Sequence, residues 1–180
     1  MSVVTITAGH SNTDSGAVNT VTKDKESDIV RDMRNMVCHY LNRDTSIVVR
    51  SDGDGLRNAS LSEAISMIHG SDLAIEFHCN ASTNTTARGT EALSKPKDRE
   101  ISQRLCAAVS VALGTKLRGD LGWKPENSGQ HSRLGFVSNG GIILELFFLS
   151  NLIELDAWKA KKWLVAKAVA NVIITEVKGA

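Results

Sequence analysis

A single carboxylate, Glu145, lies inside an apolar run that extends from residue 141 to residue 149. Such a run is typical of a buried strand in a parallel or mixed sheet. An unpaired carboxylate that is buried there costs several kcal/mol of stability or takes up a proton. We therefore expect the carboxylate of Glu145 to contact a cation or a water held by a metal, or to face an open cleft.

Two histidines follow or end two other predicted strands. The strand at 3–8 leads to His10, and the strand at 73–78 ends at His78. Glu26 lies in the first turn of the next predicted helix, where the helix dipole tolerates a negative charge. Each residue alone has a simpler interpretation, as a hydrogen-bonded histidine or an acid at a helix start. Together, two histidines and a glutamate from separate elements form the ligand set of a catalytic zinc, which leaves one position for water.

Neighbouring residues could support this chemistry. Glu145 would act as general base toward the attacking water. Glu76 shares a strand face with His78, so it could support the histidine as an acceptor, pair with a cation or join the chemistry, and we favour the first role. Cys79 points to the opposite face and into the core. His131 lies in a predicted loop just before the last strand, where it could contact a substrate.

The composition excludes several classes of protein. The chain has 180 residues, with 21 lysines and arginines against 20 acids, so its formal net charge is +1. This length fits one domain with a sizeable core, and the balanced charge predicts neither a nucleic acid nor an acidic membrane as partner. The three cysteines lack C-x-x-C spacing and are expected to be reduced thiols. We find no signal peptide, and no apolar run reaches the roughly 18 residues of a membrane span.

Alternating strands and helices must position these side chains, which predicts a single α/β domain. Strands are expected at 3–8, 46–50, 73–78, 90–93 and 142–148, and helices at 25–42, 60–70 and 98–113. A long glycine-containing loop is expected over 114–133, at the cleft. Ser60 and Glu63 form a capping box for the second helix. Asp156 is expected to cap a final helix of about twenty residues, whose apolar content includes Trp163 and Leu164.

Several motifs occur in an order and spacing that resemble one protein family over nearly the whole chain. They are the glycine-histidine loop at 7–17, Glu26 with its helix, His78-Cys79-Asn80-Ala81, Arg88-Gly89-Thr90-Glu91, and Glu145-Leu146-Phe147-Phe148-Leu149-Ser150-Asn151. The resemblance is to the zinc-dependent N-acetylmuramoyl-L-alanine amidases of the type-3 class, found in bacterial cell-separation enzymes and phage endolysins. Two departures are Glu76, where the family commonly has a small hydroxyl residue, and Phe147, where it has glycine.

The resemblance implies a fold, a reaction and a set of site residues. The fold would be an α/β/α sandwich around a mixed, mostly parallel sheet. The reaction would be hydrolysis of the amide between the lactyl group of N-acetylmuramic acid and the L-alanine of the stem peptide in peptidoglycan. The implied roles are zinc ligands at His10, Glu26 and His78 and catalytic acid/base at Glu145. Asn80, Glu76 and His131 are further predicted as substrate-binding or supporting residues.

The biological setting expected from the sequence is phage lysis. Residues 1–180 would form one catalytic domain without a separate wall-binding domain, and no segment resembles the autoinhibitory helix of regulated members. Such an endolysin would be made in the host cytoplasm, would not associate stably with membranes, and would reach the wall through a separate membrane-lesion protein. Two alternatives stay open: a zinc hydrolase acting on another peptide or N-acyl amino acid amide, and a non-catalytic peptidoglycan-binding domain.

Overall fold

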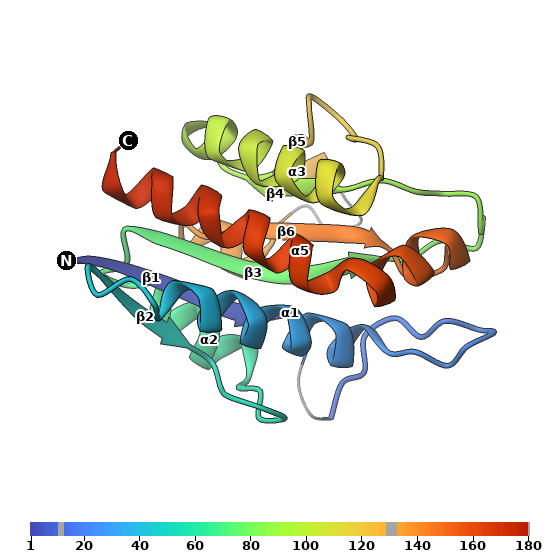
Figure 1. The fold of residues 1–180 in the computed structure, drawn as a ribbon, viewed down its shortest axis with the longest axis horizontal. Helices are drawn as coiled ribbons and strands as arrows, with labels where there is room; N and C mark the ends of the chain where they lie inside the picture. The colour runs from blue at the N-terminus through green and yellow to red at the C-terminus, as the bar shows by residue number, and fades with distance from the viewer. Residues whose placement is uncertain (11–12, 129–132, 180) are drawn as a thin grey trace.

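The computed structural model describes residues 1–10, 13–128 and 133–179. In this part of the chain six strands form one sheet in the order β2-β1-β3-β6-β4-β5 (Figure 1). All neighbouring pairs are parallel except β4 and β6, which are antiparallel. The strands are β1 Ser2–Ala8, β2 Ile47–Ser51, β3 Leu73–Asn80, β4 Glu91–Ser94, β5 Trp123–Pro125 and β6 Ile142–Phe148. The predicted mixed, mostly parallel α/β sheet is thus confirmed.

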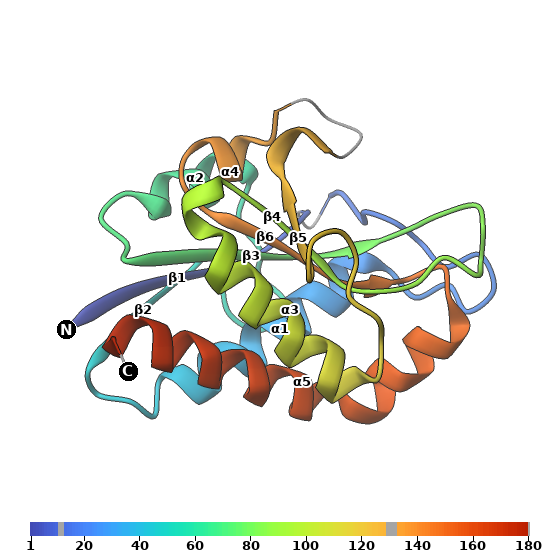
Figure 2. The same cartoon turned by 90° about the horizontal axis from the view of Figure 1, so that it is seen from above.

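The helices cover the two faces of the sheet unequally. One face packs against three long helices, α1 Glu26–Leu41, α3 Arg99–Leu113 and α5 Leu152–Lys178. Among the described residues, the other face carries only the short helices α2 Leu61–Ile68 and α4 Gly135–Ser138, with a smaller apolar cluster beneath them. Figure 2 shows α5 and α2 on opposite sides of the strands. Because α2 and α4 are short, they leave part of their face of the sheet open. Two short 3-10 helices lie at Pro96–Asp98 and Glu126–Ser128.

Strand alternation divides the side chains between these two faces. Ile75, Phe77 and Cys79 of β3 point into the large core beneath the long helices. Glu76 and His78, at the intervening positions, therefore point to the open face. The expected inward direction of Cys79 is confirmed, and all three cysteines are free thiols. None of the helices in the described ranges is long and apolar enough to cross a membrane.

The last third of the chain differs from the sequence prediction in three respects. The region 114–133 is not only loop, because it contains the edge strand β5. The final helix has 27 residues and begins at Leu152, so Asp156 lies inside it and is not its cap. The cap is Asn151, whose side chain accepts hydrogen bonds from the backbone N–H groups of Ile153 and Glu154.

The apolar residues predicted for the final helix all lie within it, but two of them are exposed. Trp163 and Leu164 are 53% and 60% exposed, whereas Trp158, Val165 and Val169 are buried. A helix of 27 residues that packs along one sheet face needs only one buried stripe, so some of its apolar residues lie outside that stripe. The capping box of α2 is confirmed, since Ser60 and Glu63 exchange both of its hydrogen bonds.

Candidate metal centre

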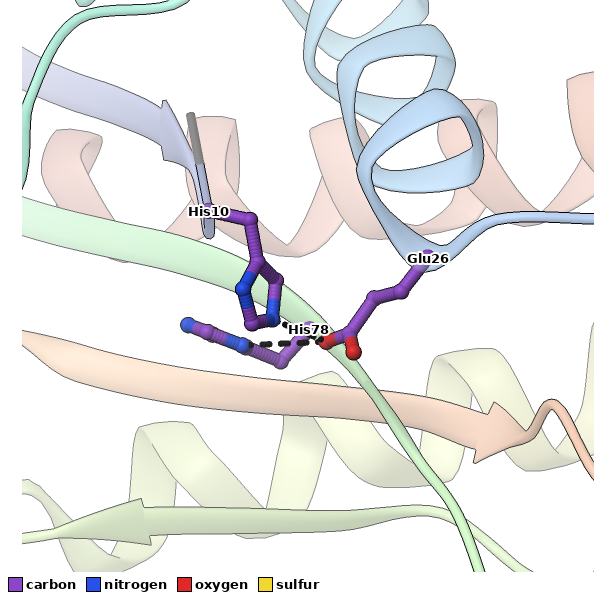
Figure 3. Close-up of side chains that lie close together, drawn as sticks. All are labelled: His10, Glu26 and His78. Atoms are coloured by element: carbon purple, nitrogen blue, oxygen red, sulfur yellow. Dashed lines mark hydrogen bonds and ion pairs between the residues drawn. The ribbon is translucent and has the colours of Figure 1, made fainter. Parts of the chain in front are cut away.

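Three side chains meet where β1 and β3 end and α1 begins (Figure 3). They are His10, which follows β1, His78 of β3, and Glu26, the first residue of α1. The Nε2 atom of His10 lies 3.0 Å from Oε1 of Glu26, and Nδ1 of His78 lies 3.1 Å from the same oxygen. One potential ligand atom from each side chain falls within 4.8 Å of the others, so the group could hold a metal ion. The structure thus brings together the three residues that the sequence singled out as ligands.

The outer nitrogen of each imidazole has its own carboxylate partner. His10 places Nδ1 at 2.9 Å from Asp14, and His78 places Nε2 at 3.2 Å from Glu76. If each ring donates its outer N–H to that carboxylate, its inner nitrogen keeps a lone pair that faces Glu26. Two lone pairs and one carboxylate oxygen then point toward the same place, which is the arrangement that a cation requires. Sequence reasoning missed Asp14, although it lies four residues after His10.

Glu26 is held in its ionised form. It is only 4% exposed, and its oxygens accept hydrogen bonds of 2.9 Å from the backbone N–H groups of Ala17 and Cys79. Burial alone would raise the pKa of Glu26, but the hydrogen bonds that Glu26 accepts when the inner nitrogens of His10 and His78 are protonated lower it well below its ordinary value. Glu26 in turn raises the pKa of His10. The ionised Glu26 thus favours a positive charge at this place, and a bound cation would supply that charge.

The backbone around His10 leaves room for the second histidine. His10 has φ of +67°, a left-handed conformation that is uncommon outside glycine. A Cβ atom added to Gly9 would lie 2.2 Å from the imidazole of His78. Glycine at position 9 is therefore needed because its backbone contacts the ring of His78 closely.

A buried polar network that sequence reasoning missed holds the end of β1. Arg34 is fully buried and donates from Nη1 to Asp52 at 3.0 Å and to Asn58 at 2.7 Å. Asn58 donates to the carbonyl oxygens of Ala8 at 3.0 Å and His10 at 2.5 Å. The network thus fixes the backbone that carries His10. In the sequence, Arg34 looks like any charged residue of an amphipathic helix.

Glu145 and Asn80 share a cleft with the three potential ligands. Glu145 lies directly opposite His78 in the register between β6 and β3. The cleft has a volume of about 410 Å³ and is lined by His10, Glu26, His78, Asn80, Glu91, Leu134 and Glu145 among others. Within the described residues, Oε2 of Glu145 and Nδ2 of Asn80 are buried without a hydrogen-bond partner. Burial raises the pKa of Glu145 to about 7, which suits a group that exchanges protons near neutral pH.

An apolar pocket adjoins the cleft. It has a volume of about 360 Å³ and shares His10, His78, Leu134 and Ile143 with the cleft. Glu76, which is 3% exposed, lines this pocket, and Thr7 donates to its second oxygen at 3.4 Å. Its contact with His78 fits the first of the three roles considered for it, which stays a prediction. His131, predicted as a substrate contact, lies outside the described residues.

Comparison with known proteins identifies the family. The family described as N-acetylmuramoyl-L-alanine amidase matches residues 4–175. A Neisseria meningitidis protein of known structure, provisionally described as an N-acetylmuramoyl-L-alanine amidase, is 48% identical, with a TM-score of 0.90 over 98% of this chain and 96% of that chain. A search of curated proteins gives no match.

Two more distant structures share the fold. The catalytic domain of the amidase CwlV from Bacillus (Paenibacillus) polymyxa is 22% identical, with a TM-score of 0.85 over 99% of each chain. The catalytic domain of the CD27L endolysin, which targets Clostridia difficile, is 22% identical, with a TM-score of 0.72 over 99% of this chain and 98% of that chain. The match over residues 4–175 and the 48% identity carry the assignment: the chain belongs to the N-acetylmuramoyl-L-alanine amidase family.

Proposed function

We propose that the protein hydrolyses the amide between the lactyl group of N-acetylmuramic acid and L-alanine in peptidoglycan, with zinc held by His10, Glu26 and His78. One observation carries the proposal: Glu145, which has a buried oxygen without a hydrogen-bond partner, lines the same cleft as the three potential ligands. Family membership supplies the substrate class. The alternative of a non-catalytic binding domain expects a missing ligand, and none is missing here.

The donor set fits zinc. Two imidazole nitrogens and one carboxylate oxygen are ligands that zinc accepts in catalytic sites, where a fourth position stays open. A zinc ion bound there would polarise the scissile carbonyl and make water a better nucleophile. The chain's own contribution is to fix the two imidazoles through Asp14 and Glu76 and to keep Glu26 ionised.

The side chains around the ligands would move protons and orient the substrate. Glu145 would accept a proton from the attacking water and later return it to the departing amine of L-alanine. Its pKa, raised to about 7 by burial, allows both directions of transfer. Asn80 would donate from its unpartnered Nδ2 to an oxygen of the substrate, because a buried amide N–H without a partner is costly otherwise.

A digest of purified peptidoglycan tests the reaction. The protein is loaded with zinc or stripped with a chelator, and mass spectrometry then identifies the soluble products. We expect stem peptides that begin with L-alanine, together with peptide-free glycan strands, only in the zinc-loaded sample. Cuts within peptides or sugars would show that the bond is wrong. Cleavage of soluble peptides with intact sacculi untouched would favour a hydrolase of another amide, and binding without any product would favour the non-catalytic domain.

We also propose that this cleavage serves lysis of a bacterial wall, as in a phage endolysin. The chain shares its fold with the catalytic domain of the CD27L endolysin, and of the described residues that line the cleft only Glu26 belongs to a helix. The protein would be made in the host cytoplasm and would reach the wall after a separate protein has opened the membrane.

Expression in a bacterial cytoplasm tests this role. We expect lysis only when a membrane-lesion protein is expressed as well, and no lysis with the Glu145→Gln variant under the same conditions. Lysis by the Glu145→Gln variant would contradict the role of wall cleavage. Intact cells after membrane opening, combined with activity of the purified protein on sacculi, would contradict the lysis role alone.

A further inference from the structure

Beyond Glu145, the open face of the sheet carries a cluster of one acid and two cations. Glu91 on β4 lies directly opposite Glu145 on β6. Its Oε2 atom accepts a hydrogen bond of 2.5 Å from Nε of Arg118 and lies 2.8 Å from Nζ of Lys124 on β5. Glu91 also lines the cleft. Arg118 and Lys124 are thus two cations that are joined to an acid of the cleft lining.

The charges in this cluster do not cancel. Hydrogen bonds from Lys124 and Arg118 lower the pKa of Glu91 although burial opposes the shift, so Glu91 is ionised and the three groups carry a net charge of +1. One cation would be enough to neutralise Glu91. The side chains of Arg118 and Lys124 are 29% and 23% exposed, so both can reach a ligand in solvent. The described lining of the cleft and of the adjoining pocket contains acids, including Glu76, Glu145 and Asp14, and Glu91 connects this lining to the two cations.

Both cations are held in place by packing. The guanidinium of Arg118 lies over the ring of Phe148, 4.7 Å from its centre. A Cβ atom at Gly89 would lie 2.7 Å from Cγ of Arg118, and one at Gly119 would lie 2.8 Å from Cγ of Lys124. Both glycines have positive φ, so the backbone itself is shaped to let the two aliphatic stems lie against it.

The distance between Glu145 and the two cations fits a substrate peptide that runs across the strands. Adjacent strands lie about 4.8 Å apart, so charges between β4 and β5 lie roughly 5–10 Å from β6. An extended peptide advances about 3.3–3.6 Å per residue, so this span corresponds to about two residues of a stem peptide beyond the scissile amide. A carboxylate on the second residue would meet two ordered N–H donors and an unbalanced positive charge.

We propose that Arg118 and Lys124, held on Glu91, bind a free carboxylate on the second residue of the stem peptide and so direct that peptide across β4 and β5. This inference rests on the proposed amidase function. The subsite would make the protein favour wall material in which that carboxylate is free over material in which it is amidated. Because the subsite acts on substrate binding, we expect the preference to appear mainly as a lower KM for the substrate with the free carboxylate.

Two synthetic muramoyl tripeptides test the subsite. Their carboxyl termini are amidated, and they differ only in whether the second residue carries a free carboxylate or a carboxamide. A charge-assisted hydrogen bond contributes about 1.5–3 kcal/mol, so we expect wild-type kcat/KM to be at least about tenfold higher for the free carboxylate. Arg118→Gln and Lys124→Gln should each reduce this preference, whereas Lys97→Gln, at a 70% exposed side chain paired with Asp98, should keep it.

The ratio between the two substrates separates binding from folding. A variant that is partly unfolded loses the same fraction of activity on both substrates, so its ratio does not change. Equal rates on both substrates in the wild type, or an unchanged preference in both cation variants, would overturn the subsite while leaving the amidase reaction intact. Cleavage of neither substrate by a zinc-loaded protein would overturn the proposed function and the subsite with it.

Discussion

At the scale of single residues, Glu145 combines burial with access to the cleft. We predict that Glu145→Gln lowers kcat by about 10²–10⁴-fold, the contribution typical of general acid–base catalysis, because glutamine has the same shape but cannot accept a proton. Bound zinc, measured by mass spectrometry of the native protein, should stay at the wild-type level since Glu145 is not among the three potential ligands. Retained activity would contradict the role of Glu145, and lost metal would indicate that Glu145 is a ligand.

Glu76 offers a second prediction at this scale. Its Oε1 atom lies 3.2 Å from Nε2 of His78, so Glu76→Ala removes the partner that orients the ring. Loss of such a partner typically weakens metal binding about 10–100-fold, which a competition titration with a chromogenic chelator would measure. Glu76→Gln should weaken it less, because its amide oxygen still accepts a hydrogen bond. Glu100→Ala, at an exposed position of α3, is the control. An unchanged zinc affinity in Glu76→Ala would contradict the positioning role.

At the scale of elements, the loop after β2 braces the end of β1 through Asn58. We predict that Asn58→Ala lowers the free energy of unfolding by about 1–3 kcal/mol, because it leaves buried carbonyl oxygens and part of Arg34 without partners. Zinc affinity should fall as well, since the backbone of His10 loses its support. Urea unfolding and the same chelator titration measure the two effects. Asn139→Ala, which removes one exposed hydrogen bond to the carbonyl oxygen of Gly135, should change neither strongly.

The elements also show what the sequence could predict. Apolar runs and helical spacing located β1, β3, β6 and most helices, because burial of those elements imposes a local period. The three potential ligands were predictable for the same reason, since strand ends and a helix start fix where they point. β5 was missed because it has three residues and ends in proline. Asn151 was missed because Asp156 offers a similar capping signal nearby.

Contacts between distant segments could not be predicted in the same way. The pair Arg34–Asp52 forms only after α1 has packed against the loop that follows β2. Neither residue has a local pattern that separates it from an exposed charge. The same holds for Arg118 and Lys124, whose partner Glu91 lies more than twenty residues earlier in the chain. Identification of the family gave the reaction class, whereas these pairs needed the tertiary structure.

At the scale of the whole molecule, the potential ligands join segments from residue 10 to residue 78. A ligand that binds only the folded state stabilises it by about 4 kcal/mol at a concentration 1,000 times its Kd, and a domain of this size gains about 2–4 °C in Tm per kcal/mol. We therefore predict one unfolding transition whose Tm rises by about 10 °C with saturating zinc. Differential scanning calorimetry would measure the shift, and His10→Ala should abolish it. An unchanged Tm of the wild-type protein on addition of zinc would contradict the metal site.

The place of β6 in the sheet sets the order in which a nascent chain can acquire activity. β6 lies between β3 and β4, both of which leave the ribosome earlier. Until residues 142–148 have been synthesised, these two strands have no common neighbour and each presents an unpaired edge, which favours association with other chains. Glu145 belongs to that last strand. Completion of the sheet and arrival of the carboxylate that we propose to transfer protons are thus one event, so we expect an unfinished polypeptide to be neither well folded nor active.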